Sequence, residues 1–168
     1  MKVLVTAASK HGSTAEIAEA IAEEIRAGGH VVVVRPLPGG DVDGFDAVVL
    51  GSSVYLGRWL KEATDFVRRH GPELRRRRVW LFSSGPVGDL PRPGDQAVDV
   101  SEVERATGAA GHAVFAGRLD RSRLTFGEKA IVLSLRAPEG DFRDWTAIHD
   151  WATFVATDLR SSSAPAQP

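Results

Sequence analysis

The sequence of 168 residues contains no cysteine, and this absence removes whole classes of chemistry. Disulfide bonds, catalytic thiolates and cysteine-based metal sites are all excluded. Long apolar runs are lacking as well, since no stretch reaches the roughly 18 apolar residues that mark a membrane-spanning helix. The opening stretch, MKVLVTAAS, has the length of a β-strand and is too short for the apolar part of a signal peptide. We therefore expect a cytoplasmic protein.

The chain also has no large excess of positive or negative charge. Lysine and arginine together number 21 against 22 aspartates and glutamates, which gives a net charge of −1. This balance predicts no nucleic-acid partner. Four histidines are scattered without the spacing of metal ligands, so we expect no metal site among them; they are His30, His70, His112 and His149.

What the chain does contain is an alternation of apolar runs with helical patterns, in one domain expected over residues 1–160. A polar tail, residues 161–168, is expected to be disordered. The alternation is typical of an α/β fold with a parallel sheet covered by helices on both faces. Five strands suit the order 2-1-3-4-5 of the flavodoxin-like three-layer sandwich. The strands are expected at residues 3–6, 30–36, 47–53, 78–85 and 112–117.

Local signals predict where several elements begin and end. The second strand, HVVVVRP, has the composition of a strand that is buried on both faces. A helix is expected to carry Trp59 in its first turn and to stop at Gly71-Pro72. Helices are also expected from Asp144 to Leu159 and from Ser101 to about Ala110. Two serines followed by glutamate three residues later fit capping boxes; these pairs are Ser13 with Glu16 and Ser101 with Glu104.

In the expected strand order, the carboxyl ends of the first and third strands form the binding crevice. The loops there are residues 7–12 and 54–57, with residues 84–89 alongside, and all three are rich in small residues. Small side chains expose backbone N–H groups, which bind anions or a flat polar ring. We therefore expect the ligand site at these loops.

The first loop narrows the choice of ligand. It has only Gly12, so it matches neither the G-x-G-x-x-G dinucleotide pattern nor the P-loop. The strand ends offer no carboxylates for the magnesium site of a response-regulator receiver, and no cysteine serves a low-molecular-weight tyrosine phosphatase. What remains is a phosphate cradle made of the hydroxyls of Ser9, Ser13 and Thr14, main-chain N–H groups and the positive end of a helix.

Four stretches together point to a family. SKHGST resembles the flavodoxin loop for the FMN phosphate, [ST]-x-T-G-x-T, with His11 where a threonine is usual. With TAEIA, VVLGSSVYLG and DWTAIHDWA, the chain resembles the menaquinone-dependent protoporphyrinogen IX oxidase branch of the flavodoxin-domain family over nearly its whole length, up to about Leu159. His11 removes a hydroxyl but keeps an N–H donor. The resemblance implies FMN as the cofactor.

The resemblance also implies the residues around FMN, although plain helix capping by Ser13 and Thr14 remains an alternative or coexisting role. Tyr55 lies in the loop expected beside the flavin ring and is either a ring neighbour or an ordinary surface residue, whereas Trp59 is expected in the core. The implied phosphate loop is Ser9, Lys10, His11, Gly12, Ser13 and Thr14; the implied ring contacts are Ser52, Ser53, Val54, Tyr55, Leu56 and Gly57, with Ser84, Gly85, Pro86, Val87 and Gly88 facing them.

Three functions fit this cofactor, and no catalytic residue stands out because the flavin itself would do the chemistry. The first is a protoporphyrinogen oxidase-like enzyme that passes electrons from a reduced substrate through FMN to a quinone. The second is a flavodoxin-type electron carrier, and the third is a binding module without redox activity. The enzyme would have a small-molecule substrate, a quinone or other redox partner, and at most peripheral membrane contact.

The connection at residues 118–143 bears on this choice, because it is far longer than an ordinary turn. It includes an expected short helix at residues 127–136. Its side chains suit a membrane surface or the carboxylates of a porphyrin, and they equally suit core packing. The apolar ones are Ile131, Val132, Leu133 and Leu135; the basic ones are Arg121, Arg123, Lys129 and Arg136.

Overall fold

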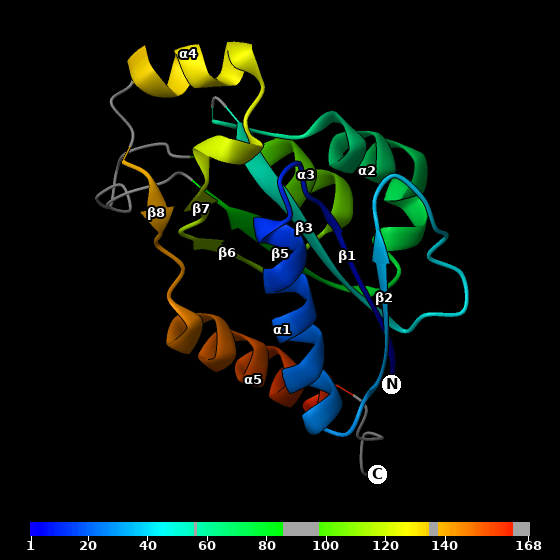
Figure 1. Cartoon of the computed structure of the whole chain (residues 1–168). Coiled ribbons are helices and arrows are strands. Elements are labelled where there is room, and N and C mark those ends of the chain that lie inside the picture. The colour runs from blue at the N-terminus through cyan, green and yellow to red at the C-terminus, as the bar shows by residue number, and fades with distance from the viewer. Residues whose placement is uncertain (56, 86–97, 135–137, 163–168) are drawn as a thin grey trace, which may run out of the picture.

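The computed structural model describes residues 1–55, 57–85, 98–134 and 138–162, and it shows a central sheet between two layers of helices (Figure 1). The sheet is parallel with the strand order β2-β1-β3-β5-β6, and a short strand, β4, pairs with β3 alone. With β4 set aside, this is the predicted order 2-1-3-4-5. The strands are β1 (Lys2–Ala8), β2 (Val31–Pro36), β3 (Ala47–Tyr55), β4 (Arg58–Trp59), β5 (Arg78–Ser84) and β6 (Gly111–Phe115).

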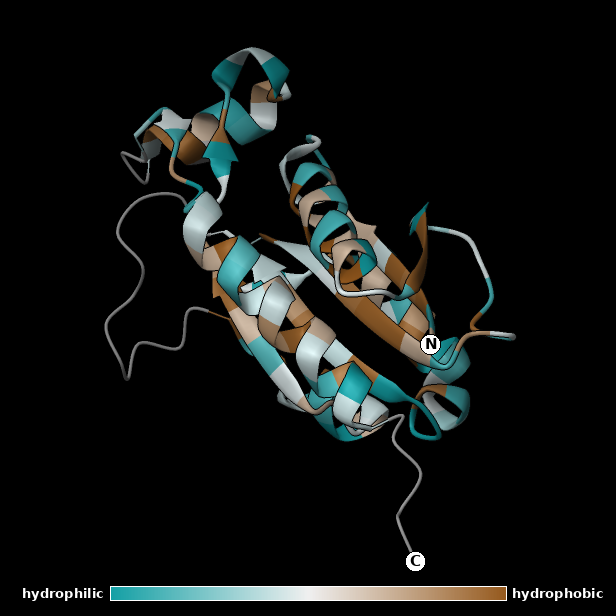
Figure 2. Cartoon of the chain, turned by 90° about the horizontal axis from the view of Figure 1, so that it is seen from below, coloured by the Kyte–Doolittle hydropathy of each residue, from teal (hydrophilic) through white to brown (hydrophobic). Residues whose placement is uncertain are grey.

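Helices α1 and α5 pack together on one face of the sheet, and α2 and α3 pack together on the other. Each face has its own apolar core, one built around Ile21 and Ile148 and the other around Leu50 and Phe66. Figure 2 shows the hydrophobic residues concentrated in the strands and in the helix surfaces that face them. The helices are α1 (Ser13–Ala27), α2 (Lys61–Leu74), α3 (Ser101–Thr107), α4 (Phe126–Ser134) and α5 (Trp145–Ser161).

The register of the sheet brings the three predicted loops to one edge. Ala8 at the end of β1 lies opposite Ser52 of β3, and Ser53 lies opposite Ser84 at the end of β5. Because parallel strands end at the same side of a sheet, the loops that follow them are neighbours. The predicted crevice therefore lies where β1, β3 and β5 end.

The prediction for β2 is wrong. Val31 is 65% exposed, and the remaining side chains of the strand are half-buried or exposed. The reason is the position of β2, which is an edge strand: within the described residues it pairs with β1 alone. Its run of valines reflects strand propensity as much as burial.

The helix predicted to begin at Trp59 is also corrected. Trp59 belongs to β4, which folds back antiparallel on the end of β3, and α2 begins only at Lys61. The helix then continues through Pro72 to Leu74, and the N–H of Arg75 donates to the carbonyl of Gly71. The burial of Trp59 agrees with the expected core position, since the side chain is 6% exposed.

Both predicted capping boxes are wrong. Gly12 is the N-cap of α1, with φ of +90°, and Ser13 is the first helical residue, whose hydroxyl accepts the N–H of Arg118. The left-handed conformation that the turn requires is readily available only to glycine. At α3 the capping residue is Val100, and the helix ends at Thr107 before reaching Ala110.

The long connection has a structure of its own. Its two ends pair as a small antiparallel ribbon, β7 (Arg118–Leu119) with β8 (Gly140–Asp141), and α4 lies between them. The helix predicted at residues 127–136 corresponds to α4; Leu135, Arg136 and the side chain of Ile131 lie outside the described residues.

The last helix begins as predicted. Asp144 caps α5 by accepting the N–H of Ala147 at 3.0 Å, and the helix runs on to Ser161. Residues 163–168 of the predicted tail lie outside the described residues. Among the helices in the described part of the chain, none combines the length and the apolar character that crossing a bilayer requires.

Candidate functional site

The loop between β1 and α1 is ordered by its own serine. Ser9 Oγ accepts the N–H groups of Gly12 and Ala15, each at 3.2 Å, and so closes the turn onto the first turn of the helix. The N–H groups of Ser13 and Thr14 lack acceptors within α1 because the first intrahelical bond runs from Glu16 to Gly12. The loop therefore offers main-chain donors at the positive end of a helix, where anions bind.

Two of the predicted loops are joined by a hydrogen bond between Thr14 Oγ1 and Ser53 Oγ, with the oxygens 2.7 Å apart. Thr14 is buried at 1% exposure, so its position relative to the end of β3 is fixed. Ser52, next to it, is fully buried; its hydroxyl accepts the N–H of Leu60 and donates to the carbonyl of Ser53. Ser52 thus stabilises the β3–β4 hairpin.

A carboxylate from α4 lies against the phosphate loop. Glu128 Oε1 is 2.7 Å from Lys10 Nζ and 3.0 Å from His11 Nε2, and Glu128 is 5% exposed. Burial by itself would raise the pKa of Glu128, but hydrogen bonds from Lys10 and from Thr125 outweigh it and hold the pKa far below its ordinary value. The same bond raises the pKa of Lys10. Both groups are therefore charged.

The ends of the long connection are tied to α1 by a second glutamate. Glu16 accepts from Arg118 Nη2 at 2.9 Å and from Arg143 Nη1 at 2.6 Å. The Arg143 side chain is 3% exposed and also binds Asp141. Hydrogen bonding from Arg143 is the largest cause of a lowered pKa at Glu16. No pattern in the sequence indicated Glu16 or Glu128 as partners, because their arginines and lysine lie far away along the chain.

Tyr55 ends β3 and is 36% exposed, with Lys10 Nζ 4.9 Å from the centre of its ring. This cation–π contact joins the phosphate loop to the predicted flavin loop. Gly57 has a φ of +75° and forms the tight turn into β4. A partly exposed aromatic ring beside an anion-binding loop is suited to a flat ligand that carries a phosphate.

Behind this loop lies a buried polar chain that the sequence did not indicate. Trp59 Nε1 donates to Ser83 Oγ at 2.7 Å, and Ser83 Oγ is 2.7 Å from His112 Nε2. Burial lowers the pKa of His112, which favours the neutral ring. The chain connects β4, β5 and β6 and holds the β3–β4 hairpin in place.

The third predicted loop is described only at its start. Ser84 is 5% exposed, and the N–H of Gly85 donates to the carbonyl of Phe115. Pro86, Val87, Gly88 and, in the second loop, Leu56 lie outside the described residues. For these four residues the predicted contacts remain predictions.

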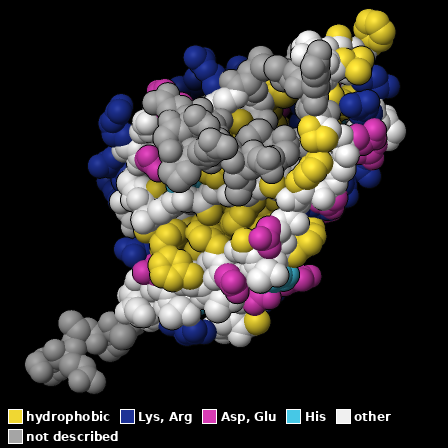
Figure 3. Space-filling view, turned by 90° about the vertical axis from the view of Figure 1, so that its left-hand side faces the viewer, with side chains coloured by type: hydrophobic (Ala, Val, Ile, Leu, Met, Phe, Trp, Pro, Cys, Tyr) yellow, Lys and Arg dark blue, Asp and Glu magenta, His cyan; other side chains and the backbone are white. Residues whose placement is uncertain are grey.

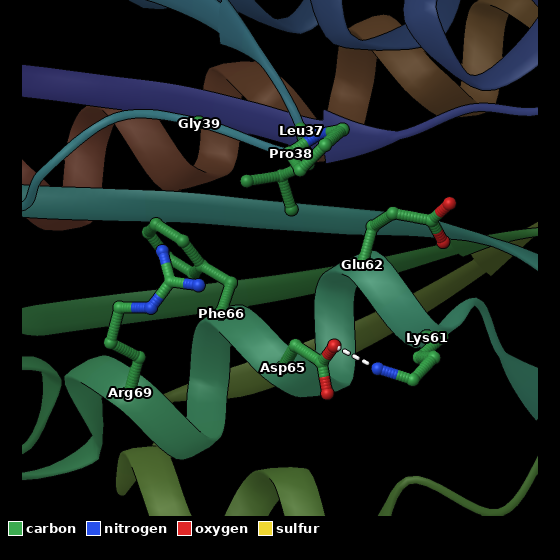
Figure 4. A pocket seen from close by; sticks show the side chains of 8 residues that line it. All are labelled: Leu37, Pro38, Gly39, Lys61, Glu62, Asp65, Phe66 and Arg69. Atoms are coloured by element: carbon green, nitrogen blue, oxygen red, sulfur yellow. Dashed lines mark hydrogen bonds and ion pairs between the residues drawn. The ribbon is translucent and has the colours of Figure 1, made fainter.

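Two hollows lie beside α2. One, of about 290 Å³, lies between α2 and the chain that follows β2, with Leu37, Phe66 and Arg69 among its walls (Figure 4). The other, of about 990 Å³, runs between α2 and α3 and begins at Arg58 and Trp59, next to the flavin loop. In the described part of the chain, no group of three or more His, Asp or Glu side chains is placed to hold a metal ion.

The model of the flavodoxin-domain family matches residues 4–146. The chain belongs to the flavodoxin-domain family. No curated protein matches the sequence.

Solved structures with a similar fold include a flavodoxin from the domain Archaea, with 17% identity and a TM-score of 0.63 over 95% of this chain and 99% of that one. Flavodoxin 1 from Bacillus cereus has 17% identity and a TM-score of 0.60 over 98% and 100% of the two chains.

A larger redox protein also contains this fold. The rubredoxin oxygen:oxidoreductase of Desulfovibrio gigas has 14% identity and a TM-score of 0.66 over 98% of this flavodoxin domain. The similar region spans only 37% of that protein's chain. At such identities the likeness concerns the fold alone.

Membership of the flavodoxin-domain family makes FMN the cofactor, and the residues present fit it. The donors suit a phosphate: two main-chain N–H groups at the start of α1 and the ammonium of Lys10. Gly12 leaves the loop free of a side chain at its turn, and Tyr55 offers a ring face at the end of β3. When bound, FMN supplies electron transfer, which none of these side chains can perform.

Proposed function

We propose that this flavodoxin domain is an FMN-dependent oxidoreductase of the protoporphyrinogen oxidase kind. It would take electron pairs from a flat reduced substrate, such as a porphyrinogen, and pass them to a quinone. The quinone is the terminal oxidant and takes up two electrons and two protons for each pair of hydrogen atoms that leaves the substrate. The resemblance of the sequence motifs to that branch motivates the choice of substrate and acceptor.

The observation that carries the proposal is the surface of α4. Phe126 is 91% exposed and Leu133 is 62% exposed, and residues seven apart lie on the same side of a helix. In Figure 3 hydrophobic side chains protrude at the top of the molecule, where Figure 1 places α4. Glu128, on the same helix, binds the phosphate loop, so this apolar stripe lies beside the cofactor site.

An exposed apolar stripe of this kind suits an apolar partner such as a quinone or the surface of the membrane that holds it. Lys129 is exposed between Phe126 and Leu133 and adds a positive charge, which favours an anionic lipid surface or a carboxylate-bearing substrate. We therefore extend the proposal to a cytoplasmic protein with peripheral membrane contact through α4.

The second candidate function is that of an electron carrier. Two similar structures whose own chains are also covered almost completely are flavodoxins, and a carrier needs only an accessible flavin. A carrier, however, has no evident use for a helix that displays Phe126 and Leu133 beside the cofactor loop. The observation therefore favours the oxidoreductase.

The test uses the purified protein loaded with FMN. Under the oxidoreductase proposal, wild-type protein oxidises a porphyrinogen when a quinone is present. The double variant Phe126→Ser/Leu133→Ser keeps its flavin spectrum and loses most of the turnover. Val31→Thr is the matched control, because Val31 is 65% exposed and lies opposite Lys2 at the start of the strands, whereas the cofactor loops follow the ends of the strands.

Two results would contradict the proposal. One is a double variant that turns over as fast as the control. The other is wild-type protein that fails to oxidise the porphyrinogen but exchanges single electrons rapidly with a ferredoxin reductase, which would establish the carrier.

A further inference from the structure

Helix α4 packs against the phosphate loop through a charged side chain, whereas helices usually turn their charged side chains to water. Among the side chains of α4 that the structure describes, the buried one is an acid, Glu128, at 5% exposure, while Phe126 and Leu133 are exposed. A buried carboxylate is costly unless charged partners and hydrogen bonds compensate it. The partners of Glu128 therefore contribute to holding this helix in place.

Those partners are the side chains of the phosphate loop. Lys10 Nζ and His11 Nε2 both bind Glu128 Oε1, while Oε2 accepts the N–H and the hydroxyl of Thr125, each at 2.8 Å. Arg123, just before α4, reaches the same loop and donates to the carbonyl of His11 at 3.0 Å. The carboxylate of Glu128 thus holds two of the side chains that the loop would offer to a phosphate, Lys10 and His11.

We propose that Glu128 is a built-in competitor of the flavin phosphate: the phosphate of FMN must displace this carboxylate from Lys10 and His11, so FMN binding loosens the docking of α4. The proposal rests on the phosphate loop as the FMN site, and it is independent of which substrate or acceptor the flavin serves. Glu128 then determines how strongly the loop distinguishes a phosphorylated flavin from an unphosphorylated one.

The charges at the loop determine whether removing the charge of Glu128 should strengthen or weaken FMN binding. Lys10 supplies one positive charge, which Glu128 already neutralises, so a second anion bound at the same loop is repelled by the charge of Glu128. Two negative charges about 8 Å apart at the edge of a protein repel by about the equivalent of a tenfold change in affinity. Glutamine has the shape of glutamate without the charge, so Glu128→Gln removes the repulsion and frees Lys10 for the phosphate.

The experiment compares two flavins on three proteins. Apoprotein of the wild type, of Glu128→Gln and of Glu139→Gln is titrated with FMN and with riboflavin, which lacks the phosphate. Glu139 is the matched control because it lies on the same connection and accepts from the N–H of Arg121, away from the phosphate loop. We expect Glu128→Gln to bind FMN roughly tenfold more tightly than wild type. Its riboflavin affinity stays at the wild-type value, and Glu139→Gln leaves both affinities unchanged.

A second measurement uses the wild-type protein alone and needs no variant to fold. Hydrogen exchange at the amides of α4 (Phe126–Ser134) is followed with each flavin at saturation. FMN is expected to speed exchange in α4, whereas riboflavin leaves it unchanged.

Weaker or unaltered FMN binding by Glu128→Gln would overturn the proposal and make Glu128 a support of the loop. Slower exchange in α4 with FMN would overturn it as well. If neither flavin binds any of the three proteins, the phosphate-loop assignment falls and this proposal with it. If the affinity pattern holds while quinone-dependent turnover is absent, only the function proposed above is overturned.

Discussion

Helices α1 and α4 meet at the phosphate loop, and they are held to the protein by opposite means. Helix α1 turns Ile17, Ile21 and Ile25 into the core, where each is fully buried. Helix α4 turns Glu128 inward and leaves Phe126 and Leu133 exposed. The first helix is held by apolar burial, whereas the buried acid of the second makes polar contacts to Lys10, His11 and Thr125.

The difference separates two kinds of stability in one small domain. Apolar burial is insensitive to pH and belongs to the cooperative fold. Ion pairs depend on protonation and on competing ions, so a helix held by them can respond to a ligand while the sheet does not. Under the proposal above, the β1–α1 unit is the side of the site that stays fixed when FMN binds, and α4 is the side that responds.

The largest difference in stability is expected when one apolar side chain in each of the two helices is shortened to alanine. Ile21→Ala should lower the free energy of unfolding by about 2–5 kcal/mol, because it leaves a cavity in the core below α1. Phe126→Ala should change it by no more than about 0.5 kcal/mol, because the ring is in water. Urea denaturation of both variants measures the two values. A loss at Phe126 equal to that at Ile21 would show that α4 belongs to the core.

Gly12→Ala tests the boundary between the two regions. Gly12 has a φ of +90°, and a Cβ there would lie 3.3 Å from Arg123 Nη1, which anchors the connection. We expect Gly12→Ala to lower the free energy of unfolding by about 1–2 kcal/mol, because alanine is strained in the left-handed conformation. Faster hydrogen exchange in α4 should accompany it as Arg123 is pushed away. Gly44→Ala, at a φ of +75° with open space around it, is the control for the backbone strain.

The pH dependence of α4 should differ from that of α1. The folded pKa of Glu128 lies below its ordinary value of 4.5, so its ion pair stabilises the docking of α4 above that pH. The stabilisation is lost as the pH falls below this value toward the folded pKa. Relative to the intrinsic exchange rate at each pH, the protection of amides against hydrogen exchange should therefore fall in α4 before it does in α1 on acidification. In Glu128→Gln this pH dependence should disappear, and its persistence would assign it to another carboxylate.

The smallest expected effect is a change in stability caused by His112 in the sheet, at a higher pH than the effect of Glu128. Burial lowers the pKa of His112 below its ordinary value of 6.5, so the unfolded chain takes up the proton more readily. The stability of the wild type should therefore fall as the pH drops below about 6.5. His112→Gln keeps an acceptor for Ser83 and should show a weaker decline in the melting temperature between pH 7 and about 5.5. Equal declines in the two proteins would remove His112 from this role.

The sequence alone predicted the features that depend on the hydrophobic periodicity of helices and strands and on the chemistry of neighbouring residues. The alternation of elements predicted a parallel sheet whose five strands suit the observed order. The helical spacing of the apolar residues after Asp144 predicted the start of α5, and the structure shows in addition that Asp144 caps it. The capping role of Ser13 was mispredicted because the preceding glycine could take a conformation that no serine adopts easily. Trp59 was placed in a helix because its spacing from the apolar residues of α2 is helical, although Trp59 pairs with Val54 in the β3–β4 hairpin and α2 begins only at Lys61.

The part of the site that escaped prediction depends on pairs that are distant in sequence. Glu128 binds His11, which is 117 positions away, and Arg143 binds Glu16, which is 127 positions away. A single sequence carries no signal for such pairs, since each residue alone looks like an ordinary surface charge. The loops of the site could be located from the strand order, but not the helix that lies on one of them.

The arrangement of the two chain ends has a practical consequence. The carbonyl of Met1 accepts the N–H of Val31, and Arg160 near the end of α5 donates to the carbonyl of Gly28. Both ends of the described fold therefore lie beside the turn between α1 and β2, at the side of the sheet away from the cofactor loops (Figure 1). A linker to an electrode, a bead or a second protein, joined before Met1 or after Ser162, would leave the loop side facing outward. The molecule can thus be immobilised in one orientation with its redox end accessible.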